Sequence, residues 1–160
     1  MHISYVSVGA TGHVLASLPL VTELVKRGVR VTYFTSENFR AMVEATGAAF
    51  SPVNTVLTDQ GKADKDVAKN MDAELPLRFL SEGAAAVEQI LAVMRQDMPH
   101  AVISDTLAIS GRLAASALKL PLIQMYTSYA SNDFFDVSAS LPKVPDTDPA
   151  RVAASKLADE

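Results

Sequence analysis

Short apolar segments alternate with segments of helical periodicity along the first 125 residues of this 160-residue sequence. The apolar segments are of strand length and rich in β-branched and aromatic residues, which is typical of buried β-strands. The segments between them repeat apolar residues every three or four positions, which indicates amphipathic helices. Such alternation predicts a parallel α/β sheet covered by helices, because parallel neighbours need a crossover connection. The predicted strands are residues 3–8, 29–34, 48–52, 101–105 and 121–125.

The predicted helices are bounded by residues that usually start or stop a helix. Gly28 ends the helix that follows the first strand, and Gly47 ends a shorter helix that Ser36 begins as N-cap. A long helix is predicted from about residue 74 to residue 96, and another from 107 to 118. One face of the long helix is expected to carry the apolar residues Leu80, Ala84, Val87, Leu91 and Met94.

Two stretches depart from this alternation. Residues 53–72 are polar and of mixed charge, which predicts a mobile, solvated loop. Residues 136–160 are predicted to form an extended segment followed by a helix that has no stop signal, so we expect the polypeptide to continue. We therefore expect a Rossmann-like, doubly wound domain over residues 1–135 and a segment that leads out of it over residues 136–160.

The composition is that of an ordinary globular protein. Hydrophobic residues make up 49% of the chain and charged residues 20%, and the formal net charge is −4. No tract concentrates Lys and Arg, so we expect no nucleic-acid partner. The absence of cysteine excludes disulfides and thiolate chemistry. Because the sequence shows neither a signal peptide nor an apolar run of bilayer length, we expect a cytoplasmic protein without a membrane partner.

His13 and Asp105 are the strongest candidates for chemistry. His13 lies in a glycine-rich turn, residues 9–13, after the first predicted strand, and Asp105 ends the fourth. In doubly wound sheets these two strands are neighbours, and ligands bind in the crevice at their carboxyl ends. The topology therefore predicts that a histidine and a carboxylate far apart in the sequence meet in one crevice.

Such a pair can act as a general base. A carboxylate that accepts from one imidazole nitrogen fixes the tautomer and stabilises the imidazolium that forms when the other nitrogen takes a proton. A base of this kind can deprotonate a hydroxyl as it attacks an electrophile, which contributes about 10²–10⁴-fold in rate. Since the sequence has no cysteine and no Gly-x-Ser-x-Gly motif, we expect the attacking group to belong to the substrate.

Other interpretations of these residues remain open. His13 could cap the following helix or bind water, and Asp105 could be a helix N-cap. Gly9-x-x-Gly12 is also half of a dinucleotide-binding fingerprint, although no glycine stands at its third position. This half-fingerprint is the basis of an alternative function, a nicotinamide-binding reductase domain.

Several weaker patterns are interpreted as structural. The Asp-x-Asp pattern at residues 64–66 resembles a metal-diphosphate motif but lies in the mixed-charge loop, and we predict no metal site. The Ser-x-x-Lys pattern at residues 116–119 falls at the end of a helix, where lysine is expected anyway. His2 and His100 each precede a strand at the end opposite the crevice, so we expect them to be structural or exposed.

Longer stretches of the sequence resemble the amino-terminal half of a family 1 glycosyltransferase, and most of all the bacterial macrolide and natural-product group. The resemblance covers about residues 1–135, and the combination of pieces carries it rather than any one of them. The matching stretches are Gly12-His13-Val14 with residues 18–35, residues 39–50, residues 99–112 with Asp105, and residues 128–132.

This resemblance implies a GT-B architecture, in which two Rossmann-like domains face each other across a cleft. The amino-terminal domain then holds the acceptor, and the other domain binds the sugar nucleotide. The resemblance also implies that His13 deprotonates the acceptor hydroxyl with support from Asp105, and that the sugar is transferred with inversion and without a metal. Further residues expected to bind substrate are Thr11, Gly12, Phe79, Met94, Tyr126, Ser128 and Asn132.

The sequence departs from the family pattern in one respect. The family's donor motif contains a cysteine, and this chain has none. We therefore expect an acceptor-binding half that takes a small hydrophobic acceptor and no cofactor. Its co-substrate would be a nucleotide sugar such as UDP-glucose, bound mainly by a further domain, so that residues 1–160 alone transfer little or no sugar. The alternatives are the reductase-type domain and a non-enzymatic small-molecule binding module.

Overall fold

The computed structural model of the chain describes residues 1–54 and 71–127, and it describes no side chains for residues 71–79 and 82. The chain divides into two compact units. One comprises Met1–Gln60 and Arg78–Thr127 and contains the whole sheet. The other comprises Gly61–Leu77 and Ser128–Glu160, of which only residues 71–77 are described. The loop predicted over residues 53–72 lies mostly outside the described residues, and the segment predicted over residues 136–160 lies wholly outside them.

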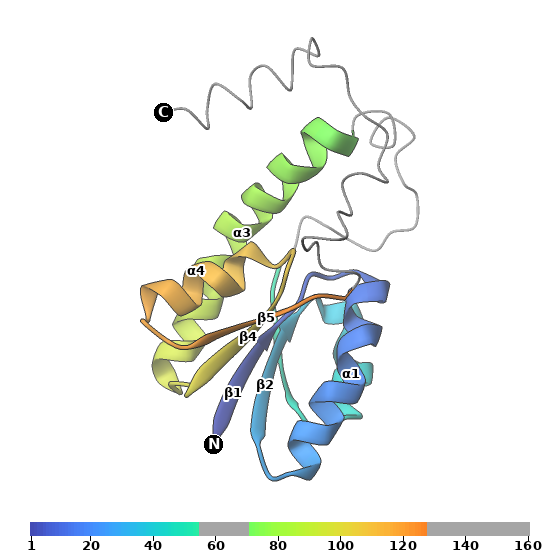
Figure 1. Cartoon of the computed structure of the whole chain (residues 1–160), viewed down its shortest axis with the longest axis vertical. Coiled ribbons are helices and arrows are strands. Elements are labelled where there is room, and N and C mark those ends of the chain that lie inside the picture. Colours follow the sequence, from blue (N-terminus) through green and yellow to red (C-terminus); the bar gives the residue numbers. More distant parts are fainter. Residues whose placement is uncertain (55–70, 128–160) are drawn as a thin grey trace, which may run out of the picture. The chain divides into compact units, whose positions relative to one another are not determined.

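Five parallel strands form one sheet in the order β3-β2-β1-β4-β5 (Figure 1). The central strand β1 (His2–Val6) pairs with β2 (Arg30–Thr35) on one side and with β4 (Ala101–Asp105) on the other. β3 (Ala49–Pro52) pairs with β2, and β5 (Leu122–Met125) pairs with β4. The strand order reverses beside β1, which is the doubly wound arrangement that the sequence predicts. The Rossmann-like α/β fold class is therefore confirmed.

Helices cover both faces of this sheet (Figure 1). α1 (Thr11–Lys26) lies on one face, and α3 (Met71–Gln96) and α4 (Ile109–Ala117) lie on the other. A 3₁₀ turn, η1 (Glu37–Phe39), and the short helix α2 (Arg40–Glu44) connect β2 to β3. None of the helices among the described residues has the length and apolar character needed to cross a bilayer.

The alternation of side chains along the central strands divides the core into two layers. Tyr5, Tyr33 and Ile103 face α1, where they pack with apolar residues of that helix. Val6 and Val102 face α3 and α4. Asp105 follows Ile103 by two positions, so its side chain leaves β4 on the face that α1 covers. The first turn of α1 and the end of β4 therefore meet on one side of the sheet.

Two glycines allow α4 to pack closely against its neighbours. A Cβ atom on Gly111 would lie 2.4 Å from Oγ of Ser104 and 2.9 Å from Cβ of Val6. A Cβ atom on Gly83 of α3 would lie 3.0 Å from Cβ of Ile109. A larger residue at either position would push a helix away, so these glycines set the distance of α4 from the sheet and of α3 from α4.

The contact at Gly83 also explains why the apolar face predicted for α3 is wrong near the start of this helix. Leu80 is 54% exposed and Ala84 is also exposed, whereas Gly83 and Ala86 are buried. Small residues are needed where α3 crosses α4, and this requirement sets the rotation of the helix. α3 also begins at Met71 rather than at about residue 74.

Ser36 precedes η1 at the N-cap position, but its side chain makes no capping hydrogen bond. Its hydroxyl instead donates to Oδ1 of Asn38 at 2.7 Å. The helix predicted after Ser36 is therefore divided into a 3₁₀ turn and the five-residue α2. Gly47 ends this region in a left-handed conformation with φ of 85°, as the sequence predicts.

Candidate functional site

The carboxyl ends of β1 and β4 bring His13 and Asp105 together, as the topology predicts. Nδ1 of His13 lies 2.7 Å from Oδ2 of Asp105, although 92 positions separate the two residues in the sequence. The Asp105 side chain is fully buried, and the His13 side chain is 23% exposed. An ionised carboxylate can only accept a hydrogen bond, so in the neutral imidazole Nδ1 carries the proton and Nε2 the lone pair.

The turn after β4 holds the second oxygen of Asp105. Oδ1 accepts a hydrogen bond from the backbone N–H of Leu107 at 2.8 Å. The carbonyl oxygen of Asp105 accepts from the N–H of Ala108 at 2.9 Å, and Ala108 rather than Asp105 is the N-cap of α4. The helix N-cap interpretation of Asp105 is thus wrong, because its side chain bonds a turn that precedes the helix. These bonds offset the cost of burying a carboxylate.

Thr127, which follows the carboxyl end of β5, also lies beside His13. Its Oγ1 lies 3.1 Å from Nδ1 of His13, and the residue follows β5. Thr127 is not among the site residues predicted from the sequence. The available signal was its position two residues after a predicted strand, because all parallel strands of the sheet end at the same edge.

His13 occupies the first turn of α1. The backbone N–H groups of His13 and Val14 both donate to the carbonyl oxygen of Ala10, each at 3.0 Å. Ala10 is the N-cap of the helix, and no side-chain hydrogen bond caps this end from that position. The backbone of this first turn therefore fixes the position from which the His13 side chain reaches Asp105.

Two buried tyrosines lie on the face of the sheet that α1 covers. Tyr5 of β1 and Tyr33 of β2 are register partners, and neither is exposed. Their rings are stacked, with centroids 4.8 Å apart and planes inclined by 15°. Burial raises the pKa of both phenols, and the negative charge of Asp105 adds to the rise. Both side chains are therefore neutral hydrogen-bonding groups at physiological pH.

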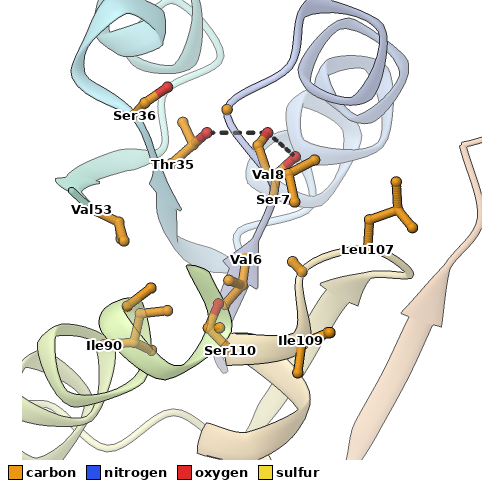
Figure 2. Close-up of a pocket in the computed structure, with 14 residues that line it drawn as sticks. Val6, Ser7, Val8, Thr35, Ser36, Val53, Ile90, Leu107, Ile109 and Ser110 are labelled. Carbon is orange, nitrogen blue, oxygen red and sulfur yellow. Dashed lines mark hydrogen bonds between the residues drawn. The ribbon is translucent and has the colours of Figure 1, made fainter. Parts of the chain in front are cut away.

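A small hollow opens at the carboxyl end of β1, next to α3 and α4 (Figure 2). The space within it that a water-sized sphere can occupy is about 10 Å³, close to that of one water molecule. Its apolar walls include Val6, Val53 and Ile90. Hydroxyl groups are brought to its lining by four residues that were not predicted as site residues from the sequence, which are Ser7, Thr35, Ser36 and Ser110.

Leu107 connects this hollow to the histidine–aspartate pair. Leu107 is one of the lining residues, and its backbone N–H holds Oδ1 of Asp105. Gly9 also lines the hollow, at the start of the segment that leads from β1 into α1 and His13. The two features are thus formed by the same two loops.

The other predicted substrate residues differ in their positions. Thr11 and Gly12 are exposed at the start of α1, and a Cβ atom on Gly12 would meet nothing within 4 Å. Tyr126 is 47% exposed and follows β5. Met94 is 1% exposed, packs in the core on the α3 side, and is not among the lining residues of the hollow. Outside the described part lie the side chain of Phe79 and the residues Ser128 and Asn132.

His2 and His100 lie at the opposite end of the sheet and have structural contacts. His2 is 3% exposed, its Nε2 lies 2.9 Å from Oγ1 of Thr32, and its backbone N–H donates to Nδ1 of His100 at 3.1 Å. The expectation that these histidines are structural or exposed is confirmed, since His100 is exposed. Among residues 1–54 and 71–127, no group of three or more His, Asp or Glu side chains is arranged to hold a metal ion.

The fold and this pair of residues define the class, a Rossmann-like domain with a histidine and an aspartate in its ligand crevice. No model of a known protein family matches the chain. The NDP-glycosyltransferase YjiC of Bacillus subtilis (strain 168) is 35% identical over 136 residues, which cover 85% of this chain and 34% of the relative. The oleandomycin glycosyltransferase of Streptomyces antibioticus is 32% identical over 125 residues, or 78% of this chain and 29% of the relative.

A solved structure agrees with these sequence matches. The calicheamicin glycosyltransferase CalG4 superimposes with a TM-score of 0.78 at 27% identity, over 99% of this chain and 41% of that one. The chain therefore belongs to the family 1 glycosyltransferases of the GT-B fold and corresponds to their amino-terminal part. It spans about a third of the length of the curated relatives. The family expected from the sequence is confirmed.

Proposed function

We propose that this chain is the acceptor-binding part of an inverting glycosyltransferase that transfers a hexose from a nucleotide sugar to a hydroxyl of a hydrophobic natural product. His13 is the general base in this proposal, and Asp105 supports it. The observation that carries the proposal is the 2.7 Å contact between Nδ1 of His13 and Oδ2 of Asp105. It lies at the crevice of the sheet, where folds of this kind bind their ligands.

The proposed reaction is a single displacement at the anomeric carbon. The acceptor hydroxyl donates a hydrogen bond to Nε2 of His13, and its oxygen attacks the anomeric carbon of the sugar. The proton passes to Nε2 while the bond between the anomeric carbon and the phosphate oxygen breaks, and the electron pair leaves with the nucleoside diphosphate. In-line attack inverts the configuration. The Asp105 carboxylate stabilises the resulting imidazolium.

The surroundings of the pair support a hydrophobic acceptor. Apolar side chains and hydroxyl groups line the neighbouring hollow, although its accessible space is only that of about one water molecule, and Tyr126 is 47% exposed beside Thr127. Gly12 leaves open space next to His13. Apolar surface with a few placed polar groups is typical of small-molecule sites. An acceptor that is largely apolar and carries a hydroxyl, such as a macrolide, a phenol or a flavonoid, matches these surroundings.

The nucleotide sugar is a co-substrate in this proposal, and we assign its binding mainly to protein outside residues 1–160. The basis is length, since the chain spans 34% of the Bacillus subtilis relative. We therefore expect residues 1–160 alone to transfer little or no sugar. UDP-glucose is the first donor to test.

The proposal is tested by replacing each member of the pair in the protein expressed at the full length that its gene encodes. Release of UDP from UDP-glucose is measured with a panel of phenolic, flavonoid and macrolide acceptors. His13→Ala is expected to lower kcat by about 10²–10⁴-fold, the usual contribution of a general base, and Asp105→Asn to lower it substantially. His100→Ala is the matched control, because His100 is exposed at the other end of the sheet.

Normal turnover in His13→Ala would refute the role of His13 as base. Fluorescence titration with NADH and NADPH tests the reductase alternative, which rests on Gly9-x-x-Gly12 alone, and tight saturable binding would favour it. Acceptor binding without transfer by the full-length protein, for every donor in a panel of nucleotide sugars, would favour a binding module.

A further inference from the structure

A chain of buried hydroxyl groups ties the first turns of α1 to β2. The hydroxyl oxygen of Tyr33 lies 2.6 Å from Oγ of Ser17. Oγ of Ser17 lies in turn 2.7 Å from the carbonyl oxygen of Val14. Neither Ser17 nor Tyr33 is exposed. This series of hydroxyl groups, called the hydroxyl chain below, therefore runs from β2 into α1 without contact with solvent.

The count of protons fixes the direction of both hydrogen bonds. A carbonyl oxygen can only accept, so Ser17 donates its one proton to Val14. Tyr33 must then donate to Ser17. Each donor in the chain has one acceptor, and breaking either bond would leave a buried polar group unsatisfied. Ser7 also lies close enough to oppose the rise in the pKa of Tyr33, but its hydroxyl donates to the carbonyl oxygen of Val8 at 3.2 Å.

The hydroxyl chain ends on the part of α1 that carries the proposed base. Val14 follows His13, and Ser17 lies one helical turn after His13, on the same face of the helix. Asp105, the partner of His13, is held from the β4 side by the Leu107 amide. The 2.7 Å contact between Nδ1 and Oδ2 thus joins two independently anchored segments, and the hydroxyl chain anchors the segment that holds His13.

We propose that Tyr33 and Ser17 are positioning residues for His13. They hold the first turn of α1 against β2, so that Nδ1 stays on Asp105 and Nε2 stays directed at the acceptor. This inference rests on the proposed role of His13 as general base. Misplacement of a reacting group by about 1 Å can lower the rate by up to about 10²-fold, so a loosened turn has a measurable effect.

Tyr5 provides a matched control for Tyr33. Its ring is stacked on that of Tyr33 and is equally buried, but its hydroxyl has no hydrogen-bond partner. Ser17 lies close enough to oppose the rise in the pKa of Tyr5, yet its only proton is donated to Val14. Tyr5→Phe and Tyr33→Phe therefore remove the same atom from neighbouring rings, and only the second change breaks the chain.

The test uses the full-length protein labelled with ¹⁵N-histidine. The signal of His13 is assigned by its loss in His13→Ala, a change that leaves the other two histidines of the 160 residues, His2 and His100, in place. The proton on Nδ1 of His13 is observed by NMR in the parent protein and in Tyr33→Phe, Ser17→Ala and Tyr5→Phe. Turnover is measured in parallel over a range of pH with UDP-glucose and the best acceptor.

We expect Tyr33→Phe and Ser17→Ala to broaden or remove the Nδ1–H signal and to lower kcat by about tenfold with little change in the KM for the acceptor. The acid limb of the pH–rate profile should shift in both variants. The double variant should be no slower than the slower single variant, because the same chain is broken in each. Tyr5→Phe should leave the signal, the rate and the profile unchanged.

The proposal is overturned if Tyr33→Phe and Tyr5→Phe give the same His13 signal and the same rate. Melting temperatures measured alongside separate loss of the fold from loss of position, and Ser17→Ala breaks the chain from its other member if Tyr33→Phe does not fold. Full turnover in His13→Ala would refute the proposed function instead. The NMR signal would still decide whether the chain positions the imidazole.

Discussion

Replacement of Gly111 by alanine is expected to lower the stability of the fold, whereas the same replacement at Gly12 is not. A Cβ atom at position 111 would lie 2.9 Å from Cβ of Ser104 and 2.9 Å from Cβ of Val6, and 2.4 Å from Oγ of Ser104. Both Cβ atoms are fixed by strands in the middle of the sheet. The clash can be relieved only if α4 moves outward.

The magnitude follows from two opposing effects. Overpacking a core costs about 1–3 kcal/mol, and we take the upper end because two of the close atoms cannot rotate away. Replacing glycine by alanine inside a helix contributes about 0.5–1 kcal/mol in the opposite direction. The net loss is about 2 kcal/mol, which corresponds to a fall in Tm of about 4–8 °C for a protein of this size. Gly12→Ala meets no atom within 4 Å and should raise the Tm slightly or leave it unchanged.

The assay is thermal unfolding followed by circular dichroism, with both variants compared to the parent protein. A third variant tests the cause. Adding Ser104→Ala to Gly111→Ala removes the 2.4 Å contact, so part of the lost stability should return even though Ser104→Ala alone removes a hydrogen bond to Ala108. If Gly111→Ala melted as high as Gly12→Ala, the close packing of α4 on β1 and β4 would be refuted.

Three further predictions concern other parts of the structure. Tyr5→Phe removes a buried hydroxyl that has no partner, so chemical unfolding should show unchanged stability or a gain of up to about 1 kcal/mol. Burial, and then the charge of Arg30, lowers the pKa of His2 from 6.5, so the unfolded chain takes up this proton first as the pH falls. Stability should therefore fall below about pH 6.5, as measured by urea midpoints, and should fall less in His2→Asn. Gly12→Leu fills the open space beside His13 and should raise the acceptor KM about tenfold at an unchanged Tm.

Each of these predictions has an outcome that contradicts it. A clear loss of stability in Tyr5→Phe would mean that its hydroxyl has a partner. An equal pH dependence in His2→Asn and in the parent protein would assign the titration to other groups, and His100→Gln serves as the control there. An unchanged acceptor KM in Gly12→Leu would place the acceptor away from the start of α1.

The position of the candidate site could be predicted because it depends on strand order and not on side-chain packing. Buried strands and helical segments alternate clearly in the sequence, and the predicted strand over residues 101–105 matches β4. Once β1 and β4 are neighbours, the residues at their carboxyl ends must meet. Topology alone therefore predicts that His13 and Asp105 lie in one crevice, while the 2.7 Å contact depends in addition on side-chain packing.

Features that depend on tertiary contacts were not predictable in the same way. The exposure of Leu80 and Ala84 results from the crossing of α3 over α4 at Gly83, and the periodicity of one helix does not contain that crossing. The hydroxyl chain from Tyr33 to Ser17 requires the register of β2 and the rotation of α1 together. The position of Thr127 after a predicted strand indicated this edge of the sheet, but its contact with Nδ1 of His13 depends on how the polypeptide turns after β5.

The strand order also divides the sheet into two blocks, each formed by one continuous part of the sequence. Residues 1–54 supply the contiguous block β3-β2-β1, residues 71–127 supply β4 and β5, and within the sheet the two blocks join along a single seam, the β1–β4 pairing. The bond between His13 and Asp105 spans this seam, with one partner from each block. Neither block holds a complete pair by itself. The contact between His13 and Asp105 therefore forms only when the two blocks are paired along the β1–β4 seam. Two separately expressed pieces that carry these blocks would form it only by complementation.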